Sequence, residues 1–451
     1  MQSRRARAGA IAACSTLVAL SLAGPAAAAG GDPDGAQPLP GYTVDNPPLA
    51  PLTVDGRPTR VIQGIHEHAA FDLEVPPNWN GKLVIWAHGF TGAGTVLRVD
   101  PPSFGLRETF VKEGYAWAAS SYTRNGYDAG VGVSSSHDLA EHAAALLGHH
   151  PSRTYIAGVS MGGHVIGRSL EQYPHYYDGA LPMCGQLGDN RLFDYYLDVN
   201  LVAQALSGVR AYPAPADYGT TDLPQIMTKL GLAGLQPGQT PDNELGRELQ
   251  QITVQLSGGP RPGADPSFAS YSTALLSFAP GGPSVAQNLH TRYTPTTPVD
   301  VNPIIERVGP ASFKERRSMA LNSVPRIVGK PRVPVLSLHD AGDLFVPLSM
   351  EQIYAKEVAR NGQSDLLVQR AIRGSDHCDF TPAEAGKAWK DLQTWVEAGG
   401  AKAPASARPE GDDITDPKAV TDPSFGCRFT DPTASRNPAR RFFPACPVNA
   451  G

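Results

Sequence analysis

Basic charge, cysteine and long apolar runs are all scarce in this chain of 451 residues. Charged residues make up 18% of it and the formal net charge is −5, so the concentrated basic surface of a nucleic-acid-binding protein is not expected. The one long apolar run lies at the extreme N-terminus, which argues against stable insertion in a membrane. No glycine-rich phosphate-binding loop occurs, and the five cysteines lack the close Cys/His spacing of a zinc site. The sequence therefore predicts neither a nucleic-acid partner nor a metal or other cofactor.

The N-terminal apolar run has the order of a secretory signal peptide. Three arginines fall within the first seven residues, an apolar stretch runs from Ala8 to Ala23, and small residues continue to Ala29. We expect cleavage after Ala29 and an extracellular protein. Two variants are weaker: the Ser-Arg-Arg triplet suggests twin-arginine export but lacks the apolar residues that should follow it. Cys14 resembles a lipoprotein cleavage site but comes before a full apolar core.

Apolar runs of strand length alternate with stretches of helical spacing over most of the chain. Continuous apolar runs of this length are typical of strands buried on both faces of a sheet. The expected strands are 61–65, 70–75, 83–87, 115–122, 155–157, 180–183, 333–338 and 366–372. The expected helices between them are 136–147, 163–171, 349–360 and 382–398. This alternation predicts an α/β fold with a mostly parallel sheet and helices on both of its faces.

The alternation is interrupted by about 150 residues without a buried-strand signal, too many for a plain loop. Helical spacing recurs there at 192–206, 243–256, 267–278 and 311–322, which predicts a helical insertion. The expected layout is a signal peptide (1–29), an extended lead-in (30–59), an α/β core (60–187 and 327–398), a helical cap (188–326) and a proline-rich tail (399–451).

A Gly-x-Ser-x-Gly motif, Gly158 to Gly162, lies directly between an expected strand and an expected helix. A serine in such a tight turn is held in a strained backbone conformation, and glycines two residues away on either side avoid collisions. The helix N-terminus behind the serine favours developing negative charge. Because the motif also arises by chance, its place after a buried strand is what favours Ser160 as a nucleophile over a serine in an ordinary glycine-rich turn.

The motif and its context resemble the α/β-hydrolase superfamily, in which an acid and then a histidine follow the serine along the chain. Asp343 lies three residues before a Val-Pro pair, as the acid of the family does; Asp340 is the runner-up and more typical of a turn. His377 follows the last expected strand, similar to the histidine loop of the family. The resemblance covers about 60–398. It implies a triad in which Ser160 attacks, His377 acts as base and Asp343 orients the imidazole.

The resemblance also implies an oxyanion hole made of two backbone N–H groups. The first belongs to Met161, directly after the serine, and the second to Phe90, in a His-Gly-Phe loop similar to the oxyanion loop of the family. Tyr122, at the end of an expected strand, is a candidate for substrate contact. Core packing is the more ordinary role of an aromatic residue there.

Four cysteines remain after removal of the expected signal peptide, and an even number in an oxidising compartment favours disulfides. Of the three possible pairings we favour Cys427 with Cys446, closing a small loop in the tail, and Cys184 with Cys378. In the α/β-hydrolase fold the second bond would tie the histidine loop to the end of the strand that follows the nucleophile strand. Tannase-like esterases also have a cysteine after the histidine, but its partner directly precedes the serine, where this chain has Val159.

The sequence thus favours a secreted serine hydrolase of carboxylic esters, acting on a small-molecule or polymeric ester. Two alternatives remain open. One is a serine peptidase similar to prolyl aminopeptidases, whose oxyanion loop typically carries more glycines and a proline than His88-Gly89-Phe90. The other is a noncatalytic binding protein on the same fold, although such a protein would usually show a broken triad. Nothing in the sequence indicates the oligomeric state.

Overall fold

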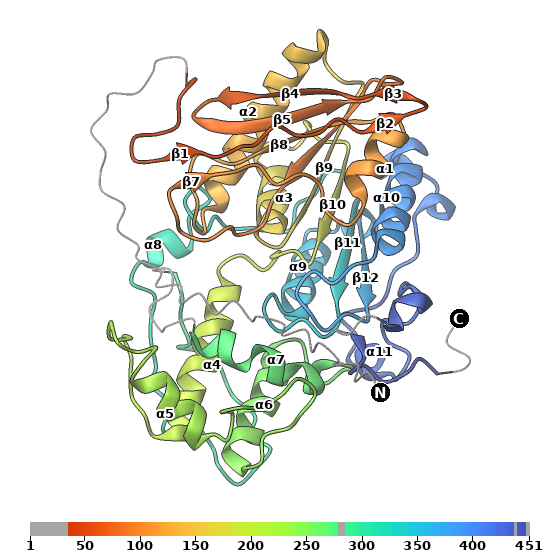
Figure 1. Ribbon diagram of the computed structural model, residues 1–451. Coiled ribbons are helices and arrows are strands. Elements are labelled where there is room, and N and C mark those ends of the chain that lie inside the picture. Colours follow the sequence, from red (N-terminus) through yellow and green to blue (C-terminus); the bar gives the residue numbers. More distant parts are fainter. Residues whose placement is uncertain (1–34, 278–284, 437–439, 448–451) are drawn as a thin grey trace, which may run out of the picture.

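A computed structural model of the protein describes residues 35–277, 285–436 and 440–447 (Figure 1). The expected signal peptide, 1–29, lies outside the described residues. Within the described part of the chain, no helix combines the length and the apolar composition needed to cross a membrane.

An eight-stranded sheet forms the centre of the molecule, in the order β12-β11-β10-β9-β6-β8-β5-β4. All neighbours pair in parallel except β4 with β5 and β5 with β8. The strands are β4 (Arg60–His66), β5 (Ala69–Val75), β6 (Lys82–Ala87), β8 (Ala116–Ser120), β9 (Arg153–Val159), β10 (Gly179–Met183), β11 (Val335–Asp340) and β12 (Leu367–Ile372). The mostly parallel α/β sheet expected from the sequence is confirmed, and each of these strands overlaps one predicted run.

Alternate residues of the central strands divide the core between the two faces of the sheet. Val84 and Trp86 of β6 pack with helices α1 (Leu106–Lys112) and α10 (Pro382–Glu397). Leu83 and Ile85 belong to a second cluster. It is formed with helices α2 (Ala129–Leu147), α3 (Met161–Gln172) and α9 (Leu348–Arg360). Both faces are therefore covered by helices, which explains why β6 is apolar at consecutive positions.

The segment between β10 and β11 contains five described helices, and their apolar side chains form a cluster that Leu344, Val346 and Met350 join. The helices are α4 (Arg191–Ser207), α5 (Asp222–Lys229), α6 (Glu244–Leu256), α7 (Ala264–Ser277) and α8 (Phe313–Arg316). Figure 1 shows α4–α7 grouped together beyond one end of the strands. We call the residues from 188 to 326 the cap.

The helix predicted at 311–322 is wrong in extent, because only α8 is helical there. The carbonyls of Asn322 and Ser323 accept hydrogen bonds from Gly130 and Ala129 at the start of α2. These carbonyls therefore accept from the free N–H groups at the start of another helix, and the stretch is not helical itself. The sequence prediction also missed α1 and α5, which have only 7 and 8 residues.

Irregular segments border the sheet at both ends of the chain. The lead-in forms two short ladders, β1 (Thr43–Val44) with β7 (Val96–Leu97), and β2 (Thr53–Val54) with β3 (Arg57–Pro58). The tail contains the short helix α11 (Pro417–Thr421) and packs against edge strand β12. There the N–H of Asp412 donates to the carbonyl of Gln369 at 2.8 Å, and its carboxylate accepts from the N–H of Ala371 at 2.8 Å. The tail is thus an ordered cover on that edge.

Candidate active site

Ser160 occupies the turn between β9 and α3 with φ 55° and ψ −120°, a strained conformation for any residue except glycine. A Cβ added at either Gly158 or Gly162 would lie 2.1 Å from the carbonyl oxygen of Ala87 at the end of β6. Only glycine fits at these two positions, which is the physical reason for the motif. The turn is fixed further because Ser160 donates its N–H to the carbonyl of Met183, at 3.1 Å.

The structure brings Ser160, His377 and Asp343 together, although the serine and the histidine are 217 positions apart along the chain. His377 Nε2 lies 2.8 Å from Ser160 Oγ, and His377 Nδ1 lies 2.6 Å from Asp343 Oδ2. An ionised carboxylate only accepts hydrogen bonds, so Nδ1 is the donor and Nε2 is left to accept from the serine hydroxyl. The three groups therefore form an unbroken proton-relay chain.

Asp343 is completely buried at the carboxyl end of β11. Its Oδ1 accepts hydrogen bonds from the backbone N–H groups of Phe345 at 2.7 Å and Val346 at 3.1 Å, which leaves Oδ2 for the histidine. Asp340 is not in this chain: its Oδ2 accepts instead from the N–H of Asp379 at 2.9 Å. Burial raises the pKa of Asp340 well above its ordinary value, and the neighbouring Asp343 and Asp379 carboxylates act in the same direction.

A disulfide joins the histidine loop, residues 373–381, to the core. The structure contains the two bonds favoured from the sequence, Cys184–Cys378 and Cys427–Cys446. Cys184 follows β10, and its N–H donates to the carbonyl of Leu338 in β11, so it is a rigid anchor. Cys378 directly follows His377, and the bond therefore restrains the imidazole next to the serine.

The loop after β6 lies against the serine. A Cβ added at Gly89 would stand 3.1 Å from Ser160 Cβ, so the backbone approaches the nucleophile closely there. Phe90 is partly buried, and Met161 is the first residue of α3. Their N–H groups remain the predicted oxyanion donors.

Tyr122 is 1% exposed, which favours core packing over contact with substrate. Its ring stacks on His88 at 3.9 Å and its hydroxyl donates to the His88 carbonyl at 3.2 Å. Burial lowers the pKa of His88, so a neutral imidazole lies against the tyrosine. Tyr122 thus supports the loop beside the serine from behind.

Sequence reasoning missed the residues by which the cap contacts the acid loop, residues 341–347. Tyr195 and Tyr196 of α4 donate from their hydroxyl groups to the carbonyls of Leu344 and Phe345, each at 2.8 Å. The Phe345 ring in turn lies 5.3 Å from the His377 ring. The tyrosine pair lies in a helix that is buried on nearly all sides, and no local motif could have marked it.

Arg261 is a second contact between the cap and the acid loop. Its Nε donates to the carbonyl of Ala341 at 2.5 Å, and Nη1 donates to the carbonyl of Gly259 at 2.8 Å. Burial lowers the pKa of Arg261 to about 10, although the nearby Asp343 carboxylate opposes this effect. The guanidinium therefore stays charged at neutral pH beside the buried acid.

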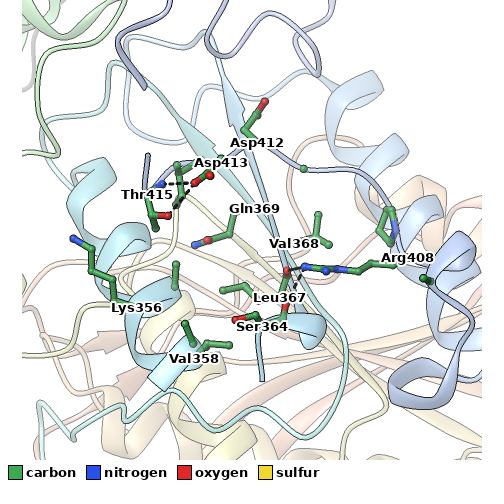
Figure 2. A pocket seen from close by; sticks show the side chains of 16 residues that line it. Lys356, Val358, Ser364, Leu367, Val368, Gln369, Arg408, Asp412, Asp413 and Thr415 are labelled. Carbon is green, nitrogen blue, oxygen red and sulfur yellow. Dashed lines mark hydrogen bonds between the residues drawn. The ribbon is translucent and has the colours of Figure 1, made fainter. Parts of the chain in front are cut away.

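A cleft of about 580 Å³ lies elsewhere, between α9, β12 and the tail (Figure 2). Its lining includes Lys356, Gln369, Arg408 and Asp413, and none of Ser160, Asp343 and His377. Among the described residues, one group has ligand atoms close enough for a metal ion: Cys184, His377 and Cys378. Both of its sulfur atoms are committed to the disulfide, so it offers no thiolate.

No protein-family model matches the chain. It is 24% identical over 414 residues to o-phthalyl amidase of Xanthobacter agilis, an alignment that covers 74% of this chain and 89% of that one. Among solved structures it is similar to an esterase from Aspergillus oryzae (TM-score 0.40, 12% identity, 77% of this chain and 81% of that one). It is also similar to the rice cell wall degrading esterase LipA from Xanthomonas oryzae (TM-score 0.36, 16% identity, 77% and 86%).

The fold assignment rests on the architecture of this chain itself. The serine turn follows the strand beside β6, the acid follows β11 and the histidine follows β12, so all three lie at the carboxyl ends of parallel strands. Ser, Asp and His also occur in that order along the chain. The sheet order, the serine turn and this chain order together are those of the α/β-hydrolase fold.

Proposed function

We propose that the protein is a serine hydrolase that cleaves carboxylic esters through an acyl-enzyme intermediate. One observation carries the proposal: the continuous hydrogen-bonded chain from Ser160 Oγ through His377 to Asp343, with distances of 2.8 and 2.6 Å. A serine hydroxyl is a weak nucleophile at neutral pH, and such a chain is what activates it.

In the proposed mechanism His377 accepts the proton of Ser160 as Oγ attacks the ester carbonyl carbon. The buried Asp343 stabilises the imidazolium, and the N–H groups of Met161 and Phe90 hold the oxyanion. His377 then returns the proton to the leaving alcohol, which leaves an acyl group on Ser160. Water, deprotonated by the same histidine, releases the acid and restores the serine.

Amide cleavage is a second candidate, favoured by the similarity to a protein named o-phthalyl amidase. The same relay serves both reactions, because His377 can protonate an amine as well as an alcohol. The two candidates differ in the leaving group and not in the nucleophile. The prolyl-aminopeptidase alternative is one form of this second candidate.

The test is a pair of assays on the purified protein and its Ser160→Ala variant. The wild type should hydrolyse short p-nitrophenyl esters, and the variant should lose at least about a thousandfold of this activity. Strong cleavage of aryl or aminoacyl amides with negligible ester cleavage would favour the amidase. Ester cleavage that survives Ser160→Ala would contradict both candidates, because Ser160 would then not be the nucleophile. Failure of a fluorophosphonate probe to label the folded wild type would contradict both and favour the binding protein.

We also propose that the protein is secreted. The residue pattern of 1–29 supports this, and the two disulfides are compatible with an oxidising compartment.

A further inference from the structure

The C-terminal residues 440–446, together with the Cys446–Cys427 disulfide, contact both loops that carry site residues. We call them the clamp. Cys427 and Cys446 are 19 residues apart, and Arg440, Phe442 and Phe443 lie between them in sequence. The clamp is far from Ser160 along the chain, and no motif of the sequence connects it with the triad.

Arg440 contacts the end of the histidine loop and the start of α10. Its Nε donates to Asp379 Oδ2 at 3.0 Å, and its two Nη atoms donate to Glu384 Oε1 and Oε2 at 2.7 and 3.0 Å. The arginine and Glu384 are each 4% exposed. Two nearly buried carboxylate oxygens bonded by one planar guanidinium form a rigid, directional contact.

Asp379 and Glu384 are each also hydrogen-bonded to a second residue near the site. Asp379 comes two residues after His377, and its N–H donates to Asp340 at 2.9 Å. Glu384 caps helix α10 through Thr381, whose N–H donates to Glu384 Oε2 at 2.8 Å and whose Oγ1 accepts from the Glu384 N–H. Arg440 therefore holds both the residue just after the histidine–cysteine pair and the point where the loop enters α10.

Phe443 contacts the acid loop and the cap at once. A Cβ added at Gly342 of the acid loop would lie 3.0 Å from its Cε2, and a Cβ added at Gly263 of the cap would lie 2.1 Å from its Cζ. Phe442 lies against Gly238 of the cap, where an added Cβ would stand 2.5 Å from Cδ1. Three glycines thus make room for two aromatic rings, a fit that fixes the position of the clamp against both parts.

We propose that the clamp is a positioning element of the active site, and that Arg440 is the positioning residue that holds the histidine loop in register with Ser160. The proposal rests on the proposed serine-hydrolase function. Nucleophilic attack requires the imidazole within hydrogen-bond reach of the hydroxyl, and a misplacement of about 1 Å can cost about a hundredfold in rate. The Cys184–Cys378 bond restrains the residue directly after the histidine, and Arg440 restrains the next residue, Asp379.

The test compares Arg440→Met with Arg428→Met, a matched arginine of the tail whose ion pair with Glu410 lies on the surface. Each folded protein is reacted with a fluorophosphonate in excess, and both the rate constant and the final fraction of labelled serine are measured. Arg440→Met should label about 10- to 100-fold more slowly than the wild type and still reach one label per chain. The kcat for ester cleavage should fall in parallel, while KM changes less than about threefold. Arg428→Met should match the wild type.

A purely structural role would give a different pattern. Unfolded molecules would not label, while the remaining folded ones would label at the wild-type rate, so a lower final fraction with an unchanged rate constant would overturn the proposal. An unchanged rate and an unchanged fraction would overturn it as well. If Arg440→Met cannot be obtained folded, Cys427→Ser/Cys446→Ser decides by the same readout, because it opens the clamp and keeps the guanidinium; we expect about 3- to 10-fold slower labelling. A wild type that does not label at all would overturn the proposed function itself.

Discussion

Gly158 and Gly162, the two glycines of the serine turn, leave space for the carbonyl oxygen of Ala87 at the end of β6. Gly162 is helical, so alanine there would ordinarily stabilise the helix by up to about 1 kcal/mol. The new Cβ would instead lie 2.1 Å from the Ala87 carbonyl oxygen and 3.1 Å from that of His88. Helix propensity therefore predicts that Gly162→Ala stabilises the protein, whereas the collision predicts that it destabilises the protein.

We expect Gly162→Ala to lower kcat for ester cleavage at least about a hundredfold, because the collision displaces the loop that carries Phe90, a predicted oxyanion donor. Steady-state kinetics and a thermal melt check this. Gly386 of α10 is the matched control, since an added Cβ there meets no atom within 4 Å. Gly386→Ala should keep wild-type kcat and raise the melting temperature. Equal kinetics for both variants would contradict the collision argument.

Two buried aspartates lie near the histidine, and their partners predict different effects of the same substitution. Asp343→Asn should lower kcat about ten-thousandfold, because an amide does not stabilise the imidazolium and favours the wrong tautomer. Asp340→Asn should change kcat less than about tenfold, since burial raises the pKa of this carboxyl group and disfavours its charged form, and an amide oxygen can still accept from the Asp379 N–H. Steady-state kinetics on both variants decide between them; the reverse order would make Asp340 the acid.

At the scale of elements, helix α4 of the cap contains the buried carboxyl group of Asp198, whose effect on the stability of the folded protein depends on pH. Burial raises the pKa of Asp198 from 3.8 to about 7, although the Tyr293 hydroxyl donates to it at 2.6 Å. The folded state thus binds a proton that the unfolded state releases near pH 4. The stabilisation is fully present below about pH 4 and is lost as the pH rises through about 7.

Asp198→Asn should remove this loss, because the amide is neutral at every pH and can still accept from Tyr293. We expect its melting temperature to match the wild type at pH 4 and to exceed it at pH 8. Asp300 is the control. Hydrogen bonds with Asn302 lower its pKa, so its effect on the pH dependence of stability is opposite to that of Asp198. A wild type that is as stable as Asp198→Asn at pH 8 would contradict the argument.

How far the sequence could predict these elements depends on whether the signal was local. Strands such as Leu83–Ala87 are apolar at every position because both faces are covered. The serine turn is also visible in the sequence, because any side chain at its two glycines would collide with Ala87. The contacts of Tyr195 with Leu344 and of Arg440 with Glu384 join residues 149 and 56 positions apart. Nothing in either local segment indicates its partner, so these contacts could not be predicted without the fold.

At the scale of the whole molecule, the proposed export predicts a defined mature protein. Expression in a secreting host should yield an extracellular protein whose first residue is Gly30, measured by intact mass and N-terminal sequencing. A protein that keeps Met1 and stays inside such cells would contradict secretion. A lipid-modified N-terminal cysteine at position 14 would favour the lipoprotein alternative.

The Cys184–Cys378 bond also joins the polypeptide that precedes the cap to the polypeptide that follows it. A protease cut at a surface loop of the cap would therefore produce two pieces that cannot separate until a thiol reductant opens the bridge. Such a nicked molecule would migrate as one species on a non-reducing gel and as two on a reducing gel. Because the serine stays on one piece and the acid and histidine on the other, nicked enzyme that remains active would owe its assembly to contacts across the cut.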